Sequence, residues 1–268
     1  MTDIIRVELH CQSSASDGDL SPAHVARILA GAGIVWAALT DHNTIAGQEP
    51  FREALEKSGV NVVTGLEIDA RSPQGPMHLL AYGFDLQDPA LLHSLETLRH
   101  PLRASARRLA ARTSSLKGRL APSSRPSSPS DDGFDPDGTL GTAGAIRLVH
   151  QAGGLVFMAH PLAALRTIER LEAVLDWLQP QGLDGLEAFH KPYSEDTQRL
   201  LVDVAERRHL LVVAGSDFHG PHHKDGTSPG IDMPLEYWNR FATAMGLAQD
   251  SRSPGPGGQR PGPIGGKN

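Results

Sequence analysis

The sequence has one cysteine, few aromatic residues and no long apolar run. Its single cysteine, Cys11, excludes an internal disulfide and fits a reducing cytoplasm. No stretch approaches about 18 apolar residues, and the N-terminus has no long apolar segment, so neither a membrane span nor a signal peptide is predicted. Aromatic residues make up only 5% of the chain, which disfavours a long stacking track for single-stranded nucleic acid.

Positive charge is scarce overall and concentrated in one segment. The formal net charge is -6, so nothing global attracts the chain to duplex DNA or to an anionic membrane. Residues 99–130 nevertheless hold eight Lys or Arg and no Asp or Glu. Two interpretations stay open: a solvated basic helix running into a loop, or a segment in which Arg103, Arg107, Arg108 and Arg112 lie over the site and hold an anionic substrate.

Glycine and proline are abundant, with 28 and 20 residues, and they mark the segments outside the packed core. Residues 113–140 are rich in Ser, Pro, Gly and Asp, and residues 250–268 form a Gly/Pro tail. We expect one domain over residues 1–249 that contains a variable, partly flexible insertion at 99–141. The tail is expected to be disordered.

Short apolar runs alternate with amphipathic segments along the rest of the chain. The runs, each typical of a buried parallel strand, are 4–10, 35–42, 60–67, 77–85, 154–161, 183–190 and 209–219. Helical patterns cover 21–33, 47–59, 142–154, 167–179 and 194–208. Because nearly every run ends in His, Asp or Glu, a closed β/α barrel with its site at the carboxyl ends of the strands is favoured over an open doubly wound sheet.

The residues at or near these strand ends could hold metal ions. They are His10, Asp17, His42, Glu67, His78, His160, His190, Asp217 and His219. Imidazole and carboxylate together suit Mn, Fe or Zn, whereas the lack of paired cysteines excludes a structural zinc knuckle. Several such groups on one face could hold more than one ion, which suits displacement at phosphorus.

Six segments in order resemble the polymerase and histidinol phosphatase (PHP) superfamily. They are VELHCQSSASDG, LTDHNTIAG, GLEIDA with HLLAYGFD, MAHP, GLEAFH and GSDFHG. The resemblance is greatest to small bacterial phosphoesterases that hydrolyse nucleoside 3′,5′-bisphosphates, whose relatives trim short RNA from the 5′ end. It implies a distorted (β/α)7 barrel with two to three divalent ions and a metal-activated hydroxide as nucleophile.

The resemblance also implies roles for single residues. His10, Glu67 and Asp217 would hold a first metal, and Glu67 would bridge to a second ion that His78 and His160 also hold. A third ion would lie among Asp17, His42 and His219. Glu67, Asp217 and His219 are the predicted catalytic residues, and His190, Lys191, Arg103 and Arg107 are the predicted substrate-binding ones.

Two departures from the family pattern affect these expectations. The first segment normally reads Asp-Leu-His-x-His-Ser, and here Glu8 and Gln12 replace the aspartate and the second histidine. A neutral amide is a poorer ligand for Zn or Mn, so the first metal site is expected to be weak or empty. Cys11 should point to the opposite face of its strand from His10 and Gln12, as a buried structural thiol. The helical insertion usual in such relatives is here replaced by the short Ser/Pro-rich segment.

Three functions follow. The leading one is hydrolysis of phosphate monoesters of small nucleotides, with nucleoside 3′,5′-bisphosphates as the named candidate; sugar or amino-alcohol phosphates stay open. The second is 5′-3′ exoribonuclease action on short RNA. The third is a degenerate module that binds metal or nucleotide without turnover. A small phosphorylated substrate is expected, with no duplex DNA or membrane partner, and the oligomeric state is undetermined.

Overall fold

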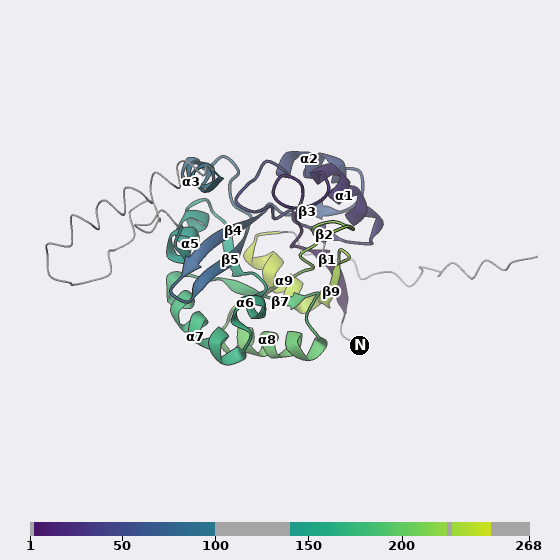
Figure 1. Ribbon diagram of the computed structural model, residues 1–268. Coiled ribbons are helices and arrows are strands. Elements are labelled where there is room, and N and C mark those ends of the chain that lie inside the picture. The colour runs from purple at the N-terminus through teal and green to yellow at the C-terminus, as the bar shows by residue number, and fades with distance from the viewer. Residues whose placement is uncertain (1–2, 100–139, 224–226, 248–268) are drawn as a thin grey trace, which may run out of the picture.

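The computed structural model describes residues 3–99, 140–223 and 227–247, and within them the strands form two sheets (Figure 1). The first has the order β3-β2-β1-β9, with β1 Ile4–Glu8, β2 Trp36–Ala37, β3 Asn61–Val62 and β9 Ile231–Pro234. The second has the order β4-β5-β6-β7-β8, with β4 Gly65–Ser72, β5 Gly75–Tyr82, β6 Leu155–Met158, β7 Gly185–His190 and β8 Leu211–Gly215.

The fold is therefore mixed α/β, but a closed (β/α)7 barrel of parallel strands is not found in the described ranges. The pairs β1/β9, β4/β5 and β5/β6 are antiparallel. Two local features, neither of which is visible in the apolar runs, account for the β4/β5 pairing. First, the run 60–67 divides into two strands, β3 and β4. Second, the two-residue turn Pro73–Gln74 folds β5 back onto β4 as a hairpin, and Gly75 directly after the turn adopts a φ of 124°, which glycine permits.

Isolated bridges connect the two sheets near the carboxyl end of β1. Cys11 pairs with Phe218, and His42 pairs with Glu67. The amide of Leu9 also donates to the carbonyl of Ala214 at 3.2 Å. These contacts bring the segments that follow β1, β2 and β8 next to the middle of β4.

Most helices lie around the outside of the sheets, whereas α9 lies at the centre of the view and contacts both sheets (Figure 1). Their bounds are α1 Pro22–Gly31, α2 Gln48–Leu55, α3 Pro89–Arg99, α5 Thr142–Gln151, α6 Pro161–Leu165, α7 Ile168–Leu178, α8 Glu195–Arg207 and α9 Leu235–Ala244, with a 3-10 turn at Gln179–Gln181. All five predicted helices are present. None of the helices in the described ranges has the length and apolarity that a bilayer span requires.

Aromatic contacts join α9 to the strands within a core whose buried side chains are mostly aliphatic. Phe241 packs edge-on against Tyr82 and Phe157, and Trp238 lies 5.0 Å from Trp36 between ring centroids. The hydroxyl of Tyr82 donates to the carbonyl of Leu9 at 2.8 Å, which satisfies a polar group in the buried interior. This packing fixes the end of β1 that carries the first candidate ligand.

A smaller apolar cluster under α1 and α2 contains Cys11, as predicted. The thiol is fully buried with Leu39 and Phe218, and its Sγ lies 3.4 Å from the carbonyl of Ala38. Burial raises the pKa of this thiol well above its ordinary value, so it stays protonated and unreactive.

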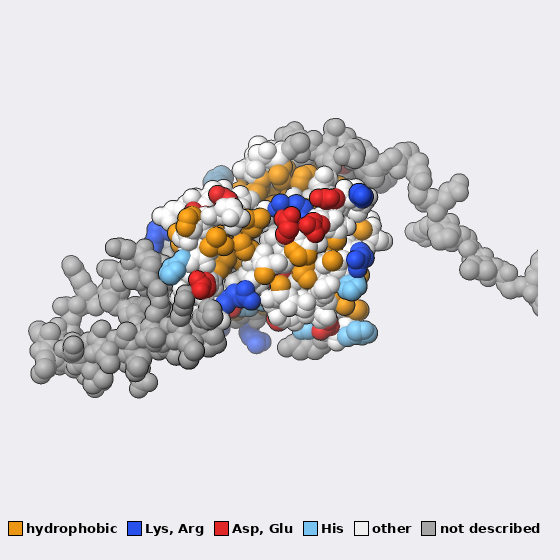
Figure 2. Space-filling view, turned by 90° about the horizontal axis from the view of Figure 1, so that it is seen from above, with side chains coloured by type: hydrophobic (Ala, Val, Ile, Leu, Met, Phe, Trp, Pro, Cys, Tyr) orange, Lys and Arg blue, Asp and Glu red, His pale blue; other side chains and the backbone are white. Residues whose placement is uncertain are grey.

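Most of the predicted insertion at 99–141 and the whole predicted tail at 250–268 lie outside the described residues. On one face of the described molecule, charges of both signs are interspersed with apolar side chains rather than forming one basic stripe (Figure 2).

Candidate metal centre

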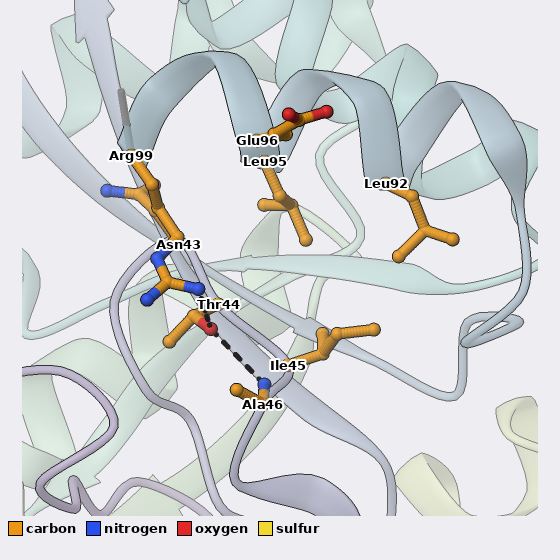
Figure 3. A pocket seen from close by; sticks show the side chains of 8 residues that line it. All are labelled: Asn43, Thr44, Ile45, Ala46, Leu92, Leu95, Glu96 and Arg99. Atoms are coloured by element: carbon orange, nitrogen blue, oxygen red, sulfur yellow. Dashed lines mark hydrogen bonds between the residues drawn. The ribbon is translucent and has the colours of Figure 1, made fainter. Parts of the chain in front are cut away.

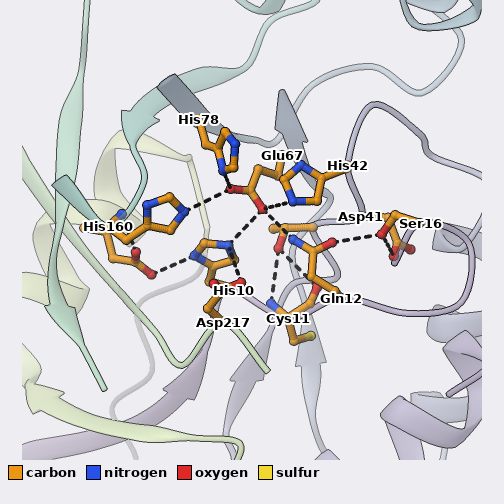
Figure 4. Close-up of polar contacts among 12 residues, drawn as sticks. His10, Cys11, Gln12, Ser16, Asp41, His42, Glu67, His78, His160 and Asp217 are labelled. Carbon is orange, nitrogen blue, oxygen red and sulfur yellow. Dashed lines mark hydrogen bonds and ion pairs between the residues drawn. The ribbon is translucent and has the colours of Figure 1, made fainter. Parts of the chain in front are cut away.

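Six of the predicted ligands converge, although they come from both sheets: His10, His42, Glu67, His78, His160 and Asp217 (Figure 4). Glu67 lies in β4 and His78 in β5, while the remaining ligands follow strands in the loops after β1, β2, β6 and β8. Four groups of side chains have ligand atoms within 4.8 Å of one another: His10 with Glu67 and His160; His10 with Glu187 and His190; Asp17 with His42 and His219; and His42 with Asp69 and His78. One of these groups, Asp17 with His42 and His219, is a set that the sequence predicted; the other three combine predicted ligands differently or include Glu187 or Asp69.

Glu67 is the centre of the arrangement. Its carboxylate is fully buried, and Oε2 lies 3.0 Å from Nε2 of His10 and 3.3 Å from Nε2 of His42. The other oxygen, Oε1, lies 2.9 Å from Nδ1 of His78 and 3.4 Å from Nε2 of His160. One carboxylate thus faces four imidazoles, two on each oxygen, which is the arrangement that a bridging ligand requires.

Several buried polar atoms at this centre make no hydrogen bond within the described residues. They are Oε1 of Glu67, Nδ1 of His78, Oδ1 of Asp217 and Nδ1 of His190. Some face one another closely without hydrogen-bond geometry, as Nδ1 of His78 and Oε1 of Glu67 do at 2.9 Å. Buried lone pairs left without donors are costly in a folded protein. A divalent cation held jointly would satisfy them, so the donor set fits metal ions.

The charge state of the centre without metal follows from the same contacts. Burial opposes a charge on His10, but Glu187, Asp217 and Glu67 outweigh it and raise the His10 pKa well above its ordinary value. Burial likewise opposes a charge on Glu67, yet the positive His10 lowers the pKa of Glu67 well below the usual range. Protons on histidine therefore balance the carboxylates, and a bound cation would displace them.

The third predicted set is more open than the first two. Nε2 of His219 lies 3.5 Å from Oδ1 of Asp17, and Nδ1 of His219 lies 2.8 Å from the carbonyl of Asp217. The hydrogen bond with His219 lowers the pKa of Asp17 to about 2. The side chain of Asp17 is 57% exposed, so this set faces solvent, whereas His10 and Glu67 do not.

Left-handed backbone conformations orient two of the ligands. Asp217 has a φ of 54° and His160 a φ of 25°, a region that non-glycine residues seldom adopt. His160 precedes α6, where the amide of His160 donates to Oε2 of Glu187 at 2.8 Å. Strained residues of this kind persist where the surroundings fix them, and they are frequent at functional sites.

Glu187 is a site residue that the sequence interpretation missed. It is fully buried in β7, and Oε1 lies 3.0 Å from Nδ1 of His10 while Oε2 lies 3.4 Å from Nδ1 of His190. The sequence did contain a signal for Glu187: it is a carboxylate within the apolar run 183–190, and a charge buried in a strand requires partners.

Asp69 and Asp41 also belong to the surroundings of the centre. The side chain of Asp69 is 52% exposed, but Oδ1 lies 2.8 Å from Nδ1 of His42 and 3.6 Å from Nε2 of His78. Asp41 accepts hydrogen bonds from the amide and hydroxyl of Ser13 at 2.7 and 2.8 Å, and thereby anchors the loop after β1.

The two substituted positions have different roles. The amide nitrogen of Gln12 donates to Oε2 of Glu67 at 2.5 Å, and its oxygen accepts from the hydroxyl of Ser16 at 3.1 Å. Gln12 therefore lies at the centre. The carboxylate of Glu8 instead accepts from the amides of His10, Ser216 and Gly230 and from the hydroxyl of Ser216, so it connects loops and is in none of the four candidate ligand groups.

The predicted substrate-binding residues are in different situations. His190 is buried beside Glu187 and shares a candidate group with His10. Lys191 donates to the carbonyl and hydroxyl of Ser228 and to the carbonyl of Gly230 at 2.7, 2.7 and 3.0 Å, so its ammonium secures a loop. Arg103 and Arg107 lie outside the described residues.

Two hollows flank the centre. One, of about 450 Å³, lies between the segment after His42 and α3, where Arg99 donates to the hydroxyl of Thr44 at 3.1 Å (Figure 3). It includes none of the predicted ligands. The other, of about 420 Å³, includes both His78 and His160.

Comparison with curated proteins gives relatives of similar length. A 5′-3′ exoribonuclease of Haemophilus influenzae is 27% identical over 88% of this chain and 99% of its own length. A 3′,5′-nucleoside bisphosphate phosphatase of Chromobacterium violaceum is 26% identical, covering 80% and 87%. A phosphoribosyl 1,2-cyclic phosphate 1,2-diphosphodiesterase of Eggerthella lenta is 27% identical, covering 80% and 94%.

Solved structures show the same fold. An amidohydrolase from Chromobacterium violaceum superposes with a TM-score of 0.69 at 21% identity, over 89% of this chain and 96% of that one. A protein from Bifidobacterium adolescentis, described as a metal-dependent phosphoesterase, gives 0.65 at 24% identity, over 88% and 95%. Residues 8–105 match the PHP domain family. These findings support a hydrolase and agree with the resemblance read from the sequence: a PHP domain is matched over residues 8–105, and the chain is similar over most of its length to bacterial proteins named as an exoribonuclease and as a nucleoside bisphosphate phosphatase.

Proposed function

We propose that this protein is a divalent-metal-dependent phosphoesterase that hydrolyses phosphate monoesters of small nucleotides, with nucleoside 3′,5′-bisphosphates as the first substrates to test. The observation that carries the proposal is the position of Glu67, whose two carboxylate oxygens each face two histidines in a buried centre. Such a carboxylate can hold two cations side by side, the arrangement that suits displacement at phosphorus.

The residues that would hold the ions are those the sequence predicted. His10, Glu67 and Asp217 would form the first set, Glu67, His78 and His160 the second, and Asp17, His42 and His219 the third. Two to three ions of Mn, Zn or Fe would suit these nitrogen and oxygen donors. Bound ions would supply a nucleophile at neutral pH and neutralise charge on the phosphate oxygens.

His219 is positioned to act as a general acid. Its Nδ1 lies 2.8 Å from the carbonyl of Asp217, which leaves Nε2 toward Asp17 and the open side of the centre. Burial opposes its charged form, but the bond with Asp17 outweighs burial and raises the His219 pKa. With ions in the first two sets alone, a protonated His219 would give its proton from Nε2 to the leaving alkoxide oxygen; an ion in the third set would occupy Nε2 and leave His219 as a ligand only.

Relatives support the substrate class without deciding it. The Chromobacterium violaceum relative is named for nucleoside bisphosphates, and those of Haemophilus influenzae and Escherichia coli are named 5′-3′ exoribonucleases. Short 5′-phosphorylated RNA is therefore the second candidate substrate. A cytoplasmic location, the 1–249 domain with its insertion, and the lack of membrane and duplex DNA partners remain predictions from the sequence.

The test is phosphate release from adenosine 3′,5′-bisphosphate by purified protein with added Mn²⁺, and with EDTA as the control. Asp217→Asn should abolish metal-dependent release, whereas Asp203→Asn on the exposed face of α8 should not alter it. No release from folded, metal-loaded protein would exclude this substrate. Cleavage of 5′-phosphorylated trinucleotides would then support the exoribonuclease, and inactivity on both would support the non-catalytic module.

A further inference from the structure

The hollow beside His78 and His160 opens directly from the candidate metal centre. Its volume is about 420 Å³, and it lies between the β4–β5 turn, the end of β6 and α6. The two histidines form part of its wall, and each also has a ring nitrogen within 3.4 Å of Oε1 of Glu67. A molecule bound in this hollow would therefore touch the same imidazoles that face the proposed bridging carboxylate.

The rest of the wall is apolar or neutral. Met77, Met158 and Ala159 line the strand side, and Ala163 and Ala164 line the helix side. Among the described residues that line it, none is Lys, Arg, Asp or Glu. A phosphate would find no Lys or Arg here, whereas polarisable methionine side chains suit a flat aromatic ring.

Two polar side chains line the rim of the hollow: Ser72 makes local hydrogen bonds, and Gln74 is placed to hydrogen-bond the polar edge of a bound ring. The hydroxyl of Ser72 donates to the carbonyl of Gly75 at 3.2 Å and accepts from the amide of Gln74 at 3.1 Å. The side chain of Gln74 lies on the exposed turn, where its carboxamide offers one donor group and one acceptor. Such an edge can pair with the ring nitrogens and exocyclic groups of a nucleobase.

We propose that this hollow binds the nucleobase of the substrate while the phosphate ester lies over His78 and His160. The proposal rests on the proposed phosphoesterase function and restricts it to substrates that carry an aromatic base. The hollow beside α3 is a poorer base site, because Arg99 and Glu96 line it and none of the predicted ligands does.

The experiment narrows the hollow without altering a candidate ligand. Ala164→Phe places a large side chain in it, and Ala164 is solvent-exposed, so the variant should fold. Ala173→Phe, on the exposed face of α7, is the matched control. The substrates are adenosine 3′,5′-bisphosphate and its abasic analogue, which has both phosphates and no base.

The wild-type protein should prefer the base-containing substrate by at least tenfold in kcat/KM. Ala164→Phe should lower this preference about tenfold by raising KM for adenosine 3′,5′-bisphosphate. Its kcat/KM for the abasic analogue should stay within twofold of the wild-type value. Ala173→Phe should leave kcat/KM for both substrates unchanged. An unchanged preference in Ala164→Phe overturns the inference while the phosphoesterase stands.

If neither compound is hydrolysed, the proposed function has failed, and binding tests the hollow separately. Calorimetry with adenosine 3′,5′-bisphosphate in EDTA should then show affinity lost in Ala164→Phe and retained in Ala173→Phe. Equal affinity in all three proteins, or binding by none of them, overturns the inference.

Discussion

The Nδ1 atom of His10 lies 3.0 Å from Oε1 of Glu187, and both side chains are fully buried. The opposite ring nitrogen, Nε2, lies 3.0 Å from Oε2 of Glu67 and 3.1 Å from Oδ1 of Asp217. A carboxylate that holds one imidazole nitrogen fixes the tautomer and the orientation of the ring, and it makes the other nitrogen a better ligand. Glu187 is thus a positioning residue for the first predicted metal set.

Replacing Glu187 with glutamine keeps the shape and removes the charge. We expect metal affinity to fall by about 10- to 100-fold, the usual effect of losing such an outer carboxylate. Titration of metal-free protein with Mn²⁺ measures it. Glu195→Gln, at a 90% exposed side chain of α8, is the matched control and should bind as the wild type does. Unchanged affinity in Glu187→Gln would show that His10 needs no such support.

Gln12 lies where the family pattern has a histidine, and its amide donates to Glu67 at 2.5 Å. Gln12→His would put an imidazole in place of that neutral amide, so we expect more bound metal per chain. Elemental analysis after dialysis measures this content directly. Gln87→His adds a histidine on the exposed surface, away from the centre, and controls for adventitious binding. Equal metal content in the wild type and Gln12→His would mean that a histidine side chain at residue 12 is not needed for the first set to bind its ion.

The pair of His42 and Asp69 predicts a pH dependence for the metal-free protein. Burial opposes the charge on His42, but the bond with Asp69 and nearby carboxylates outweigh it and raise the His42 pKa from 6.5 to about 9. The stabilisation is therefore fully present below pH 6.5 and is lost as the pH rises through about 9. A shift of this size corresponds to at most about 3–4 kcal/mol in the free energy of unfolding.

Urea unfolding in EDTA at pH 6.5 and at pH 9.5 measures that loss. Because other histidines titrate too, the informative quantity is the difference between the wild type and Asp69→Asn. The variant should lose less stability over this pH interval, since its His42 has a smaller pKa shift. Equal losses in the two proteins would contradict the assigned pairing.

Gly215, at the end of β8, allows His10 and Glu187 to approach. A Cβ added there would lie 2.2 Å from Cβ of His10 and 2.8 Å from Oε1 of Glu187. We expect Gly215→Ala to lower the free energy of unfolding by about 1–3 kcal/mol, as overpacking does, and to weaken metal binding. Gly31→Ala, in α1, meets nothing within 4 Å and should not destabilise. A fully stable Gly215→Ala protein with wild-type metal affinity would disprove this packing argument.

The sequence predicted the composition of the centre better than its architecture. Strand-end residues such as His10, His42 and Asp217 could be recognised because apolar runs stop there and polar ligand types follow. The hairpin of β4 and β5 was missed, because an apolar run does not specify whether its neighbour is parallel. β9 was missed as well, since Ile231–Pro234 is short and pairs with a strand more than 200 residues away.

By itself, the sequence determined the residue types available for chemistry, the five helices predicted from amphipathic patterns, the burial of Cys11 and the resemblance to the PHP superfamily. Only the tertiary structure decided that the strands form two sheets, that Glu187 lies behind His10 and that Asp69 faces His42. It also decided that Lys191 secures a loop. The reason is physical: periodicity and caps are local properties of the chain, whereas partners of buried charges come from segments that meet only on folding.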